Sequence, residues 1–199
     1  DKITSGTAIE RLSLTSERNE MFRVYLSGPD IFLPNSKDID NNKKAICERY
    51  GMAGVSQLDM AGDRLFNGDA KMAGEIFDQC RELITNCDLL IANMSPFRGP
   101  SLEAGTALEM GLMLGLGKPV LGYSLDKEDY AARLMKLHDV FELPLNETSG
   151  DLQAPDGLVV ENFGLSEGAL VTGAMQAAKI PISEDFESAV RWGRRLLAD

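Results

Sequence analysis

The sequence predicts an α/β fold built around a parallel sheet. Short β-rich runs alternate with helical segments between residues 22 and 123. Residues 88–94 form a nearly continuous apolar run, as is typical of a strand covered on both faces. Just before it, residues 70–86 place apolar side chains at helical spacing. Strands and helices that alternate in this way form parallel sheets with right-handed crossovers.

The first elements lie between residues 22 and 58. Residues 22–26 are rich in β-forming types and are stopped by Ser27-Gly28-Pro29, which predicts the first strand and its loop. Residues 36–50 are polar with scattered apolar positions, which indicates a surface helix. Residues 53–58 form a weaker candidate strand.

The central elements follow in the same alternation. Residues 70–86 are predicted to be a helix with one buried face, and residues 88–94 the central strand. Residues 104–116 are rich in Leu, Met, Ala and Gly, so we expect a buried helix there. Gly117-Lys-Pro stops it, and residues 120–123 form the next strand.

The last third of the chain is less regular. Residues 126–153 are polar and loop-like, with a helix predicted near 130–137. Residues 167–178 are a further candidate helix that ends before Pro181. Residues 184–197 are amphipathic, with acidic residues first and arginines last, an order that suits the helix dipole.

Length and charge restrict the class of protein. A chain of 199 residues suits one domain with a single core, which we place at residues 21–199, with residues 1–20 as a leader or extension. The 20 basic and 31 acidic residues give a net charge of −11, which argues against a nucleic-acid polymer as partner because phosphate backbones require a basic face. No apolar run approaches the roughly 18 residues of a membrane span.

The cysteines indicate a reducing compartment. Cys47, Cys80 and Cys87 are odd in number and lack the spacing of a metal site, and His138 is the only histidine. We therefore expect reduced thiols, a cytoplasmic protein and no metal.

Three loops are expected to meet at one edge of the sheet. They are residues 27–30 after the first strand, residues 93–103 after the central strand, and Tyr123 after the next one. Ligands of open parallel sheets bind at the carboxyl ends of the strands. The middle loop carries Phe97 and Arg98 among turn-forming residues, and binding residues are frequent in such loops.

Glu109 is the strongest candidate for a catalytic residue. It lies inside an otherwise apolar helix, where a carboxylate is costly to bury unless it is paired. Glu103 lies at or just before the start of that helix, and Gly105 permits a close approach of the backbone to a ligand. The pattern alone also fits a solvated Glu109 and a plain surface cation at Arg98. The residues by themselves therefore predict a pocket with two carboxylates and no defined reaction.

Two motifs resemble those of the nucleoside 2-deoxyribosyltransferase family. Residues 25–32 (Tyr-Leu-Ser-Gly-Pro-Asp-Ile-Phe) resemble its opening motif, and residues 87–111, with their Phe-Arg-Gly loop, resemble its central motif. The resemblance extends over residues 21–124, with weaker echoes at 159–165 and 185–189. It implies a flavodoxin-like three-layer sandwich. It also implies cleavage of the N-glycosidic bond of 2′-deoxynucleosides, with the deoxyribose passed to a free nucleobase and no cofactor, an activity used in nucleobase salvage.

The resemblance also implies a role for individual residues. Glu109 matches the nucleophile, which forms a covalent deoxyribosyl intermediate, and Tyr25 matches the residue that orients it. Glu103 stands where relatives usually carry the Asp that protonates or positions the base. Asp88 matches an acid with a structural role. The residues expected to bind substrate are Gly28, Pro29, Asp30, Asn93, Phe97, Arg98 and Gly105. A carboxylate nucleophile and a second carboxyl group for proton transfer are the machinery of retaining glycosidases, here applied to an N-glycoside.

The sequence departs from the family pattern at two further places. Many relatives carry Asn-Leu-Met where this chain has Gly168-Ala169-Leu170, and that segment completes the site of a neighbouring subunit. We therefore expect a homodimer or a larger homo-oligomer. Cys80 stands where relatives often have an Asp or Asn that contacts the base.

Two other functions fit the sequence. A hydrolase would release the base of a 2′-deoxynucleoside or of its 5′-monophosphate to water. For the monophosphate, the loop after the first strand holds Asp30 and no Lys or Arg before Lys37, so phosphate repulsion is expected there. A non-catalytic nucleotide-binding domain is the second alternative. The missing Asn favours it, and the intact Tyr25, Glu103 and Glu109 set argues against it.

Overall fold

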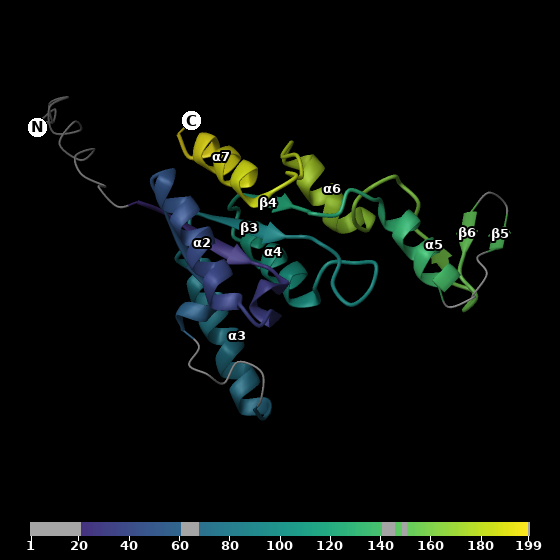
Figure 1. Cartoon of the computed structure of the whole chain (residues 1–199), viewed down its shortest axis with the longest axis horizontal. Coiled ribbons are helices and arrows are strands. Elements are labelled where there is room, and N and C mark those ends of the chain that lie inside the picture. Colours follow the sequence, from purple (N-terminus) through teal and green to yellow (C-terminus); the bar gives the residue numbers. More distant parts are fainter. Residues whose placement is uncertain (1–20, 61–67, 141–145, 149–150, 199) are drawn as a thin grey trace, which may run out of the picture.

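A four-stranded parallel sheet forms the centre of the molecule. The computed structural model describes residues 21–60, 68–140, 146–148 and 151–198, so the proposed leader, residues 1–20, lies outside it. The strands are β1 (Phe22–Ser27), β2 (Met52–Ser56), β3 (Leu89–Asn93) and β4 (Val120–Tyr123), in the order β2-β1-β3-β4 (Figure 1). The strand order reverses between β1 and β3, and ligands of such sheets bind beside that point, at the carboxyl ends of the strands.

Helices cover both faces of this sheet and confirm the flavodoxin-like three-layer sandwich. On one face, α2 (Ser36–Arg49) packs on β2, and α7 (Phe186–Leu196) packs on β3 and β4. On the other face, α4 (Ala104–Gly115) packs on β1 and β3, with α3 (Ala70–Thr85) beside it. In Figure 1, α7 lies above the strands and α3 below them, and α2 contacts α7.

The core lies between these layers, and β3 is its centre. All five residues of β3 are buried, as its apolar sequence predicts for a strand covered on both faces. Helix α7 buries Phe186, Ala189 and Val190, and the side chain of Asp185 caps it by accepting the N–H of Ser188 at 2.7 Å. The amphipathic pattern predicted for this helix is thereby confirmed.

Two expectations about the elements are wrong in part. Helix α4 is not buried all round: Thr106, Met110 and Met113 face the core, whereas Leu108 is 55% exposed and Leu116 47% exposed. An outer-layer helix contacts the sheet on one side only, and none of the described residues covers the other. Strand β2 ends at Ser56, where a capping box begins the short helix Gln57–Asp59.

A small antiparallel sheet was not predicted from the polar segment after β4. It consists of β5 (Asn146–Thr148), β6 (Asp151–Gln153) and β7 (Val159–Val160), next to α5 (Tyr130–Val140). Ala131, Ala154 and Val160 form a second small core there. Strands of two or three residues are too short to show a repeat of alternating polarity, so the sequence gives no sign of them. Helix α6 (Ala169–Ala177) then returns to the main sheet.

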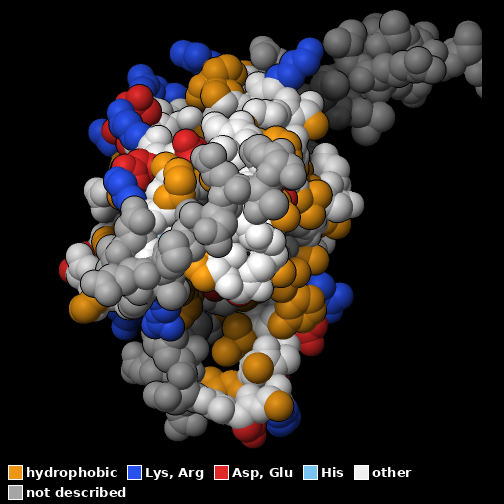
Figure 2. All heavy atoms as spheres, turned by 90° about the vertical axis from the view of Figure 1, so that its right-hand side faces the viewer, with side chains coloured by type: hydrophobic (Ala, Val, Ile, Leu, Met, Phe, Trp, Pro, Cys, Tyr) orange, Lys and Arg blue, Asp and Glu red, His pale blue; other side chains and the backbone are white. Residues whose placement is uncertain are grey.

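The surface carries charges of both signs. On the face at the α5 end of the molecule, described Lys and Arg side chains lie beside Asp and Glu along one edge rather than in a continuous basic strip (Figure 2). Within the described residues, no helix is long and apolar enough to cross a membrane. The same residues contain no group of three or more His, Cys, Asp or Glu side chains placed to hold a metal ion.

Candidate active site

Glu109 accepts two short hydrogen bonds from strand β1. The Tyr25 hydroxyl donates to Glu109 Oε1 at 2.6 Å, and Ser27 Oγ donates to Glu109 Oε2 at 2.5 Å. Tyr25 and Ser27 are two residues apart on one strand, so their side chains point to the same face of the sheet. Helix α4 covers that face and places Glu109 above them. We did not identify Ser27 as a site residue, although its two-residue spacing from Tyr25 is a signal that could have shown it.

Burial controls the protonation of this cluster. It raises the pKa of Glu109, the nearby Glu103 charge adds to the rise, and the hydrogen bonds from Ser27 and Tyr25 oppose it. Burial and the charge of Glu109 also raise the pKa of the Tyr25 phenol far above its ordinary value. Tyr25 therefore stays protonated and serves Glu109 as a hydrogen-bond donor.

Glu103 caps helix α4 with its own side chain. Its Oε1 accepts the N–H of Gly105 at 2.8 Å, and its Oε2 accepts the N–H of Thr106 at 2.6 Å and the Thr106 hydroxyl at 3.0 Å. A Cβ on Gly105 would lie 2.9 Å from Glu103 Oε2. The glycine at this position therefore makes room for the capping carboxylate, whereas the sequence had suggested room for a ligand.

A cavity of about 140 Å³ joins the two carboxylates. It receives side chains from three segments: β1 and its loop, the turn after β2, and the start of α4. Its lining residues are Tyr25, Leu26, Gly28, Ile31, Phe32, Gln57, Glu103, Gly105, Thr106 and Glu109. The structure thus brings together five of the residues singled out in the sequence: Tyr25, Gly28, Glu103, Gly105 and Glu109.

Asp30 and Asn93 bind each other beside this cavity. Asn93 Nδ2 donates to Asp30 Oδ2 at 3.1 Å, and Asn93 Oδ1 accepts the N–H of Ser95. Gly28 has φ +149°, and a Cβ on it would lie 2.6 Å from the Asn93 Cβ, so only glycine fits between these loops. These contacts hold the loops after β1 and β3 together at the strand switch.

The loop after β1 has no Lys or Arg before Lys37, but the fold brings a cation to Asp30 from α2. Lys43, on α2, donates from Nζ to Asp30 Oδ2 at 2.5 Å. Its Nζ also lies 5.4 Å from the ring centroids of Tyr123 and Phe186. Lys43 stands thirteen residues after Asp30, on a helix that was read as a surface element, so local sequence gave no sign of the pair.

Phe97 and Arg98 do not line the cavity, but both contact Phe32, which does. The rings of Phe32 and Phe97 stack with centroids 5.1 Å apart, and Phe32 is part of the cavity wall. The Arg98 guanidinium lies 4.9 Å from the Phe97 ring centroid, and Arg98 adopts a positive φ of 54°. Pro29, the remaining predicted binding residue, begins the short helix Pro29–Phe32 that carries Phe32.

Two further positions concern the family pattern. Gln57 Nε2 donates to Cys80 Sγ at 2.8 Å, and burial raises the pKa of the Cys80 thiol, so a neutral thiol adjoins the cavity wall. Asp88 accepts the N–H of Arg23 at 2.7 Å, which joins β1 to the start of β3 and fits its expected structural role. Gln57 was not identified from the sequence.

Gly168, Ala169 and Leu170 do not line this cavity. They form the start of α6, where Glu161 Oε2 accepts the N–H of Ala169 at 2.9 Å, and Leu170 is 89% exposed. A larger hollow of about 820 Å³ lies between α3 and α4, bordered by Asp78, Arg81, Leu112 and Leu116 among others. Neither Tyr25 nor the two site carboxylates reach it, so we assign the candidate site to the smaller cavity.

A family model and a relative each match most of this chain. Residues 24–170 match the model of the family described as nucleoside 2-deoxyribosyltransferase. An uncharacterised protein of Schizosaccharomyces pombe is 30% identical over 182 residues, which cover 84% of this chain and 86% of that protein.

Solved structures share the fold. A 2-desoxiribosyltransferase from Leishmania mexicana superposes with a TM-score of 0.64 at 26% identity, covering 87% of this chain and 97% of that one. A conserved protein of Enterococcus faecalis, at 19% identity and a TM-score of 0.51, covers 87% of this chain and 99% of its own, and shows the fold alone.

Proposed function

The chain belongs to the nucleoside 2-deoxyribosyltransferase family, and from that premise we propose that it transfers 2-deoxyribose between nucleobases. The observation that carries the proposal is the half-buried Glu109 carboxylate, held by Tyr25 and Ser27 at the end of β1. Two hydroxyl donors fix both oxygens of the carboxylate, so its orientation is set before a sugar binds.

The reaction we propose has two displacements. Glu109 attacks the anomeric carbon of a 2′-deoxynucleoside, the N-glycosidic bond breaks, and its electron pair leaves with the base. Glu103 supplies or positions the proton that the departing nitrogen takes up. A second base then attacks the same carbon, the ester bond to Glu109 breaks, and the carboxylate is regenerated. The proton on the attacking nitrogen returns by the same route.

A deoxynucleoside suits this cavity better than its 5′-monophosphate. The described lining residues include two carboxylates, Glu103 and Glu109, and no Lys or Arg. Lys43, the nearest buried cation to the β1 loop, is already paired with Asp30. A phosphate dianion would therefore meet like charges without compensation. Arg98 lies above the Phe97 ring at the edge of the site. Its guanidinium is the group that we would expect to bind the phosphate if the substrate were a monophosphate.

Hydrolysis is the second candidate outcome, because water can attack the same intermediate. The cavity lining includes the apolar side chains of Leu26, Ile31 and Phe32, which limit the access of water to Glu109. That feature favours transfer to a base.

We further propose that the site is completed by a second copy of the chain. The described cavity of about 140 Å³ is below the roughly 300–1,000 Å³ of typical ligand pockets. Leu170, at the position of the family segment that enters a neighbour's site, is 89% exposed, and α4 exposes Leu108 and Leu116. Light scattering at assay concentration tests whether the site needs a second copy, since a fully active monomer would contradict this proposal.

We also propose that residues 21–199 form a single cytoplasmic domain that acts in nucleobase salvage.

The test of the activity uses two parallel reactions. The protein is incubated with 2′-deoxyinosine, with and without free adenine, and the products are separated by chromatography. A new deoxynucleoside in the first tube supports the transferase, and free hypoxanthine without one indicates a hydrolase. Glu109→Ala is the matched variant and is expected to abolish both products with its circular dichroism spectrum unchanged. Near-normal turnover in that variant would refute the assignment.

A further inference from the structure

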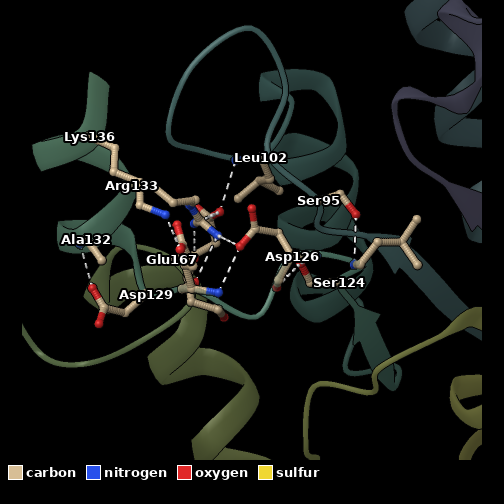
Figure 3. A network of polar contacts seen from close by, with 12 residues as sticks. Ser95, Leu102, Ser124, Asp126, Asp129, Ala132, Arg133, Lys136 and Glu167 are labelled. Carbon is tan, nitrogen blue, oxygen red and sulfur yellow. Dashed lines mark hydrogen bonds and ion pairs between the residues drawn. The ribbon is translucent and has the colours of Figure 1, made fainter. Parts of the chain in front are cut away.

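A buried ion pair outside the cavity holds the backbone at the start of α4. Glu167 is 3% exposed and Arg133 is 7% exposed, and Arg133 Nη2 donates to Glu167 Oε1 at 2.9 Å. The same oxygen accepts the N–H of Leu102 at 3.1 Å (Figure 3). Leu102 directly precedes Glu103, the cap of α4. One carboxylate oxygen therefore connects the ion pair to the residue before a site carboxylate.

Arg133 is itself fixed by its surroundings. Its Nη1 donates to the carbonyl oxygen of Glu128 at 3.1 Å and lies 3.8 Å from Asp126 Oδ1, and its Nη2 also donates to the carbonyl oxygen of Ser166. Figure 3 shows Arg133 beside Asp126 and Glu167. Because these contacts fix the position of the guanidinium, its hydrogen bond to Glu167 fixes the Glu167 carboxylate, and Oε1 then lies within hydrogen-bonding distance of the N–H of Leu102.

The loop between β3 and α4 is thus attached at both ends to the chain that follows β4. At its beginning, Ser95 Oγ accepts the N–H of Leu125 at 3.1 Å. At its end, Leu102 donates to Glu167. Between these attachments the N–H of Phe97 donates to the carbonyl oxygen of Ser101 at 2.9 Å, which closes a turn within the loop.

We propose that Glu167 is a positioning residue, which fixes Glu103 and the first turn of α4 relative to Glu109 by holding the N–H of Leu102. Glu167 lies outside the cavity lining and acts on the site only through the backbone. The proposal rests on the proposed function, because the placement of Glu103 matters for turnover only if it acts on the same substrate as Glu109. A misplacement of about 1 Å in a catalytic group can lower a rate about 100-fold.

The variants separate this role from simple stability. The double variant Glu167→Met, Arg133→Met removes the hydrogen bond from the N–H of Leu102 to Glu167 and leaves neither charge of the ion pair buried without its partner. Such replacements of a buried ion pair often leave a protein folded. Glu167→Gln retains an oxygen at the Oε1 position for both donors and should rescue the function. Glu187→Met is the matched control, because Glu187 on α7 accepts the Tyr50 hydroxyl at 2.8 Å on the opposite face of the sheet from α4 and does not contact Leu102. Glu167→Ala, which leaves room for water beside Arg133, is the second variant if the double one fails to fold.

Two measurements are made on each folded variant: hydrogen exchange of residues 100–108 by mass spectrometry, and steady-state kinetics with a 2′-deoxynucleoside. In the double variant we expect exchange at least about 10-fold faster and kcat about 100-fold lower, with KM within about 3-fold of the original. Glu167→Gln and Glu187→Met should stay within about 3-fold of the original protein in both measurements.

Unchanged exchange in the double variant would overturn the proposal, and so would faster exchange with kcat equal to that of the control. If the original protein releases no base from any deoxynucleoside, the proposed function fails instead. Exchange at residues 100–108 still decides in that case whether Glu167 positions the start of α4.

Discussion

Replacing Ser27 by alanine should move the acid limb of the pH–rate profile. The hydroxyl donates to Glu109 Oε2 at 2.5 Å and opposes the rise that burial causes in the pKa of Glu109. A hydrogen bond to a charged group contributes about 1.5–3 kcal/mol. Its loss should therefore weaken the stabilisation of the ionised carboxylate by about that amount and raise the pKa of Glu109.

The assay is kcat/KM measured from pH 4 to pH 8, which reports the ionisation of the free enzyme. In the proposed reaction Glu109 must be ionised to attack, so the acid limb should shift to higher pH in Ser27→Ala, and in the same direction in Tyr25→Phe. Ser95→Ala is the matched control, because Ser95 accepts a backbone N–H at the same edge of the sheet and does not contact Glu109. An acid limb that stays in place in both site variants would show that Glu109 is not the titrating group.

The remaining predictions concern charges around the site. Glu103→Gln removes a charge that raises the pKa of Glu109, so the acid limb should move to lower pH, and an upward shift would contradict the reasoning. Lys43→Met leaves Asp30 without its cation and should lower the free energy of unfolding by roughly 1–3 kcal/mol, measured by urea denaturation. Burial raises the pKa of Glu167 to about 6, from an ordinary value of 4.5. The stabilisation that comes from its proton is therefore complete well below pH 4.5 and is lost as pH rises through 6. The free energy of unfolding of the original protein should thus fall by about 2 kcal/mol relative to that of Glu167→Gln between about pH 3 and pH 7. A constant difference across that range would contradict this assignment.

Local sequence patterns were sufficient for the layers of the fold. The alternation of apolar runs and helical faces between residues 22 and 123 led to a parallel sheet, and the structure confirms it with the order β2-β1-β3-β4. These patterns work because each strand or helix must bury a face of its own, and that requirement repeats every two or about 3.6 residues. The small sheet β5–β7 escaped because strands of two or three residues show no such repeat.

The sequence by itself was enough to propose which residues carry the reactive groups. A carboxylate in an apolar helix and a second one at the start of that helix marked Glu109 and Glu103, and the motifs shared with the family joined Tyr25 to them. Only the tertiary structure decided what holds these groups. Ser27 meets Glu109 across 82 residues, Lys43 meets Asp30 from a neighbouring helix, and Glu167 meets Leu102 across 65 residues. Hydrogen bonds and ion pairs depend on distance and direction between atoms, and residues so far apart in the chain acquire these only when the layers pack.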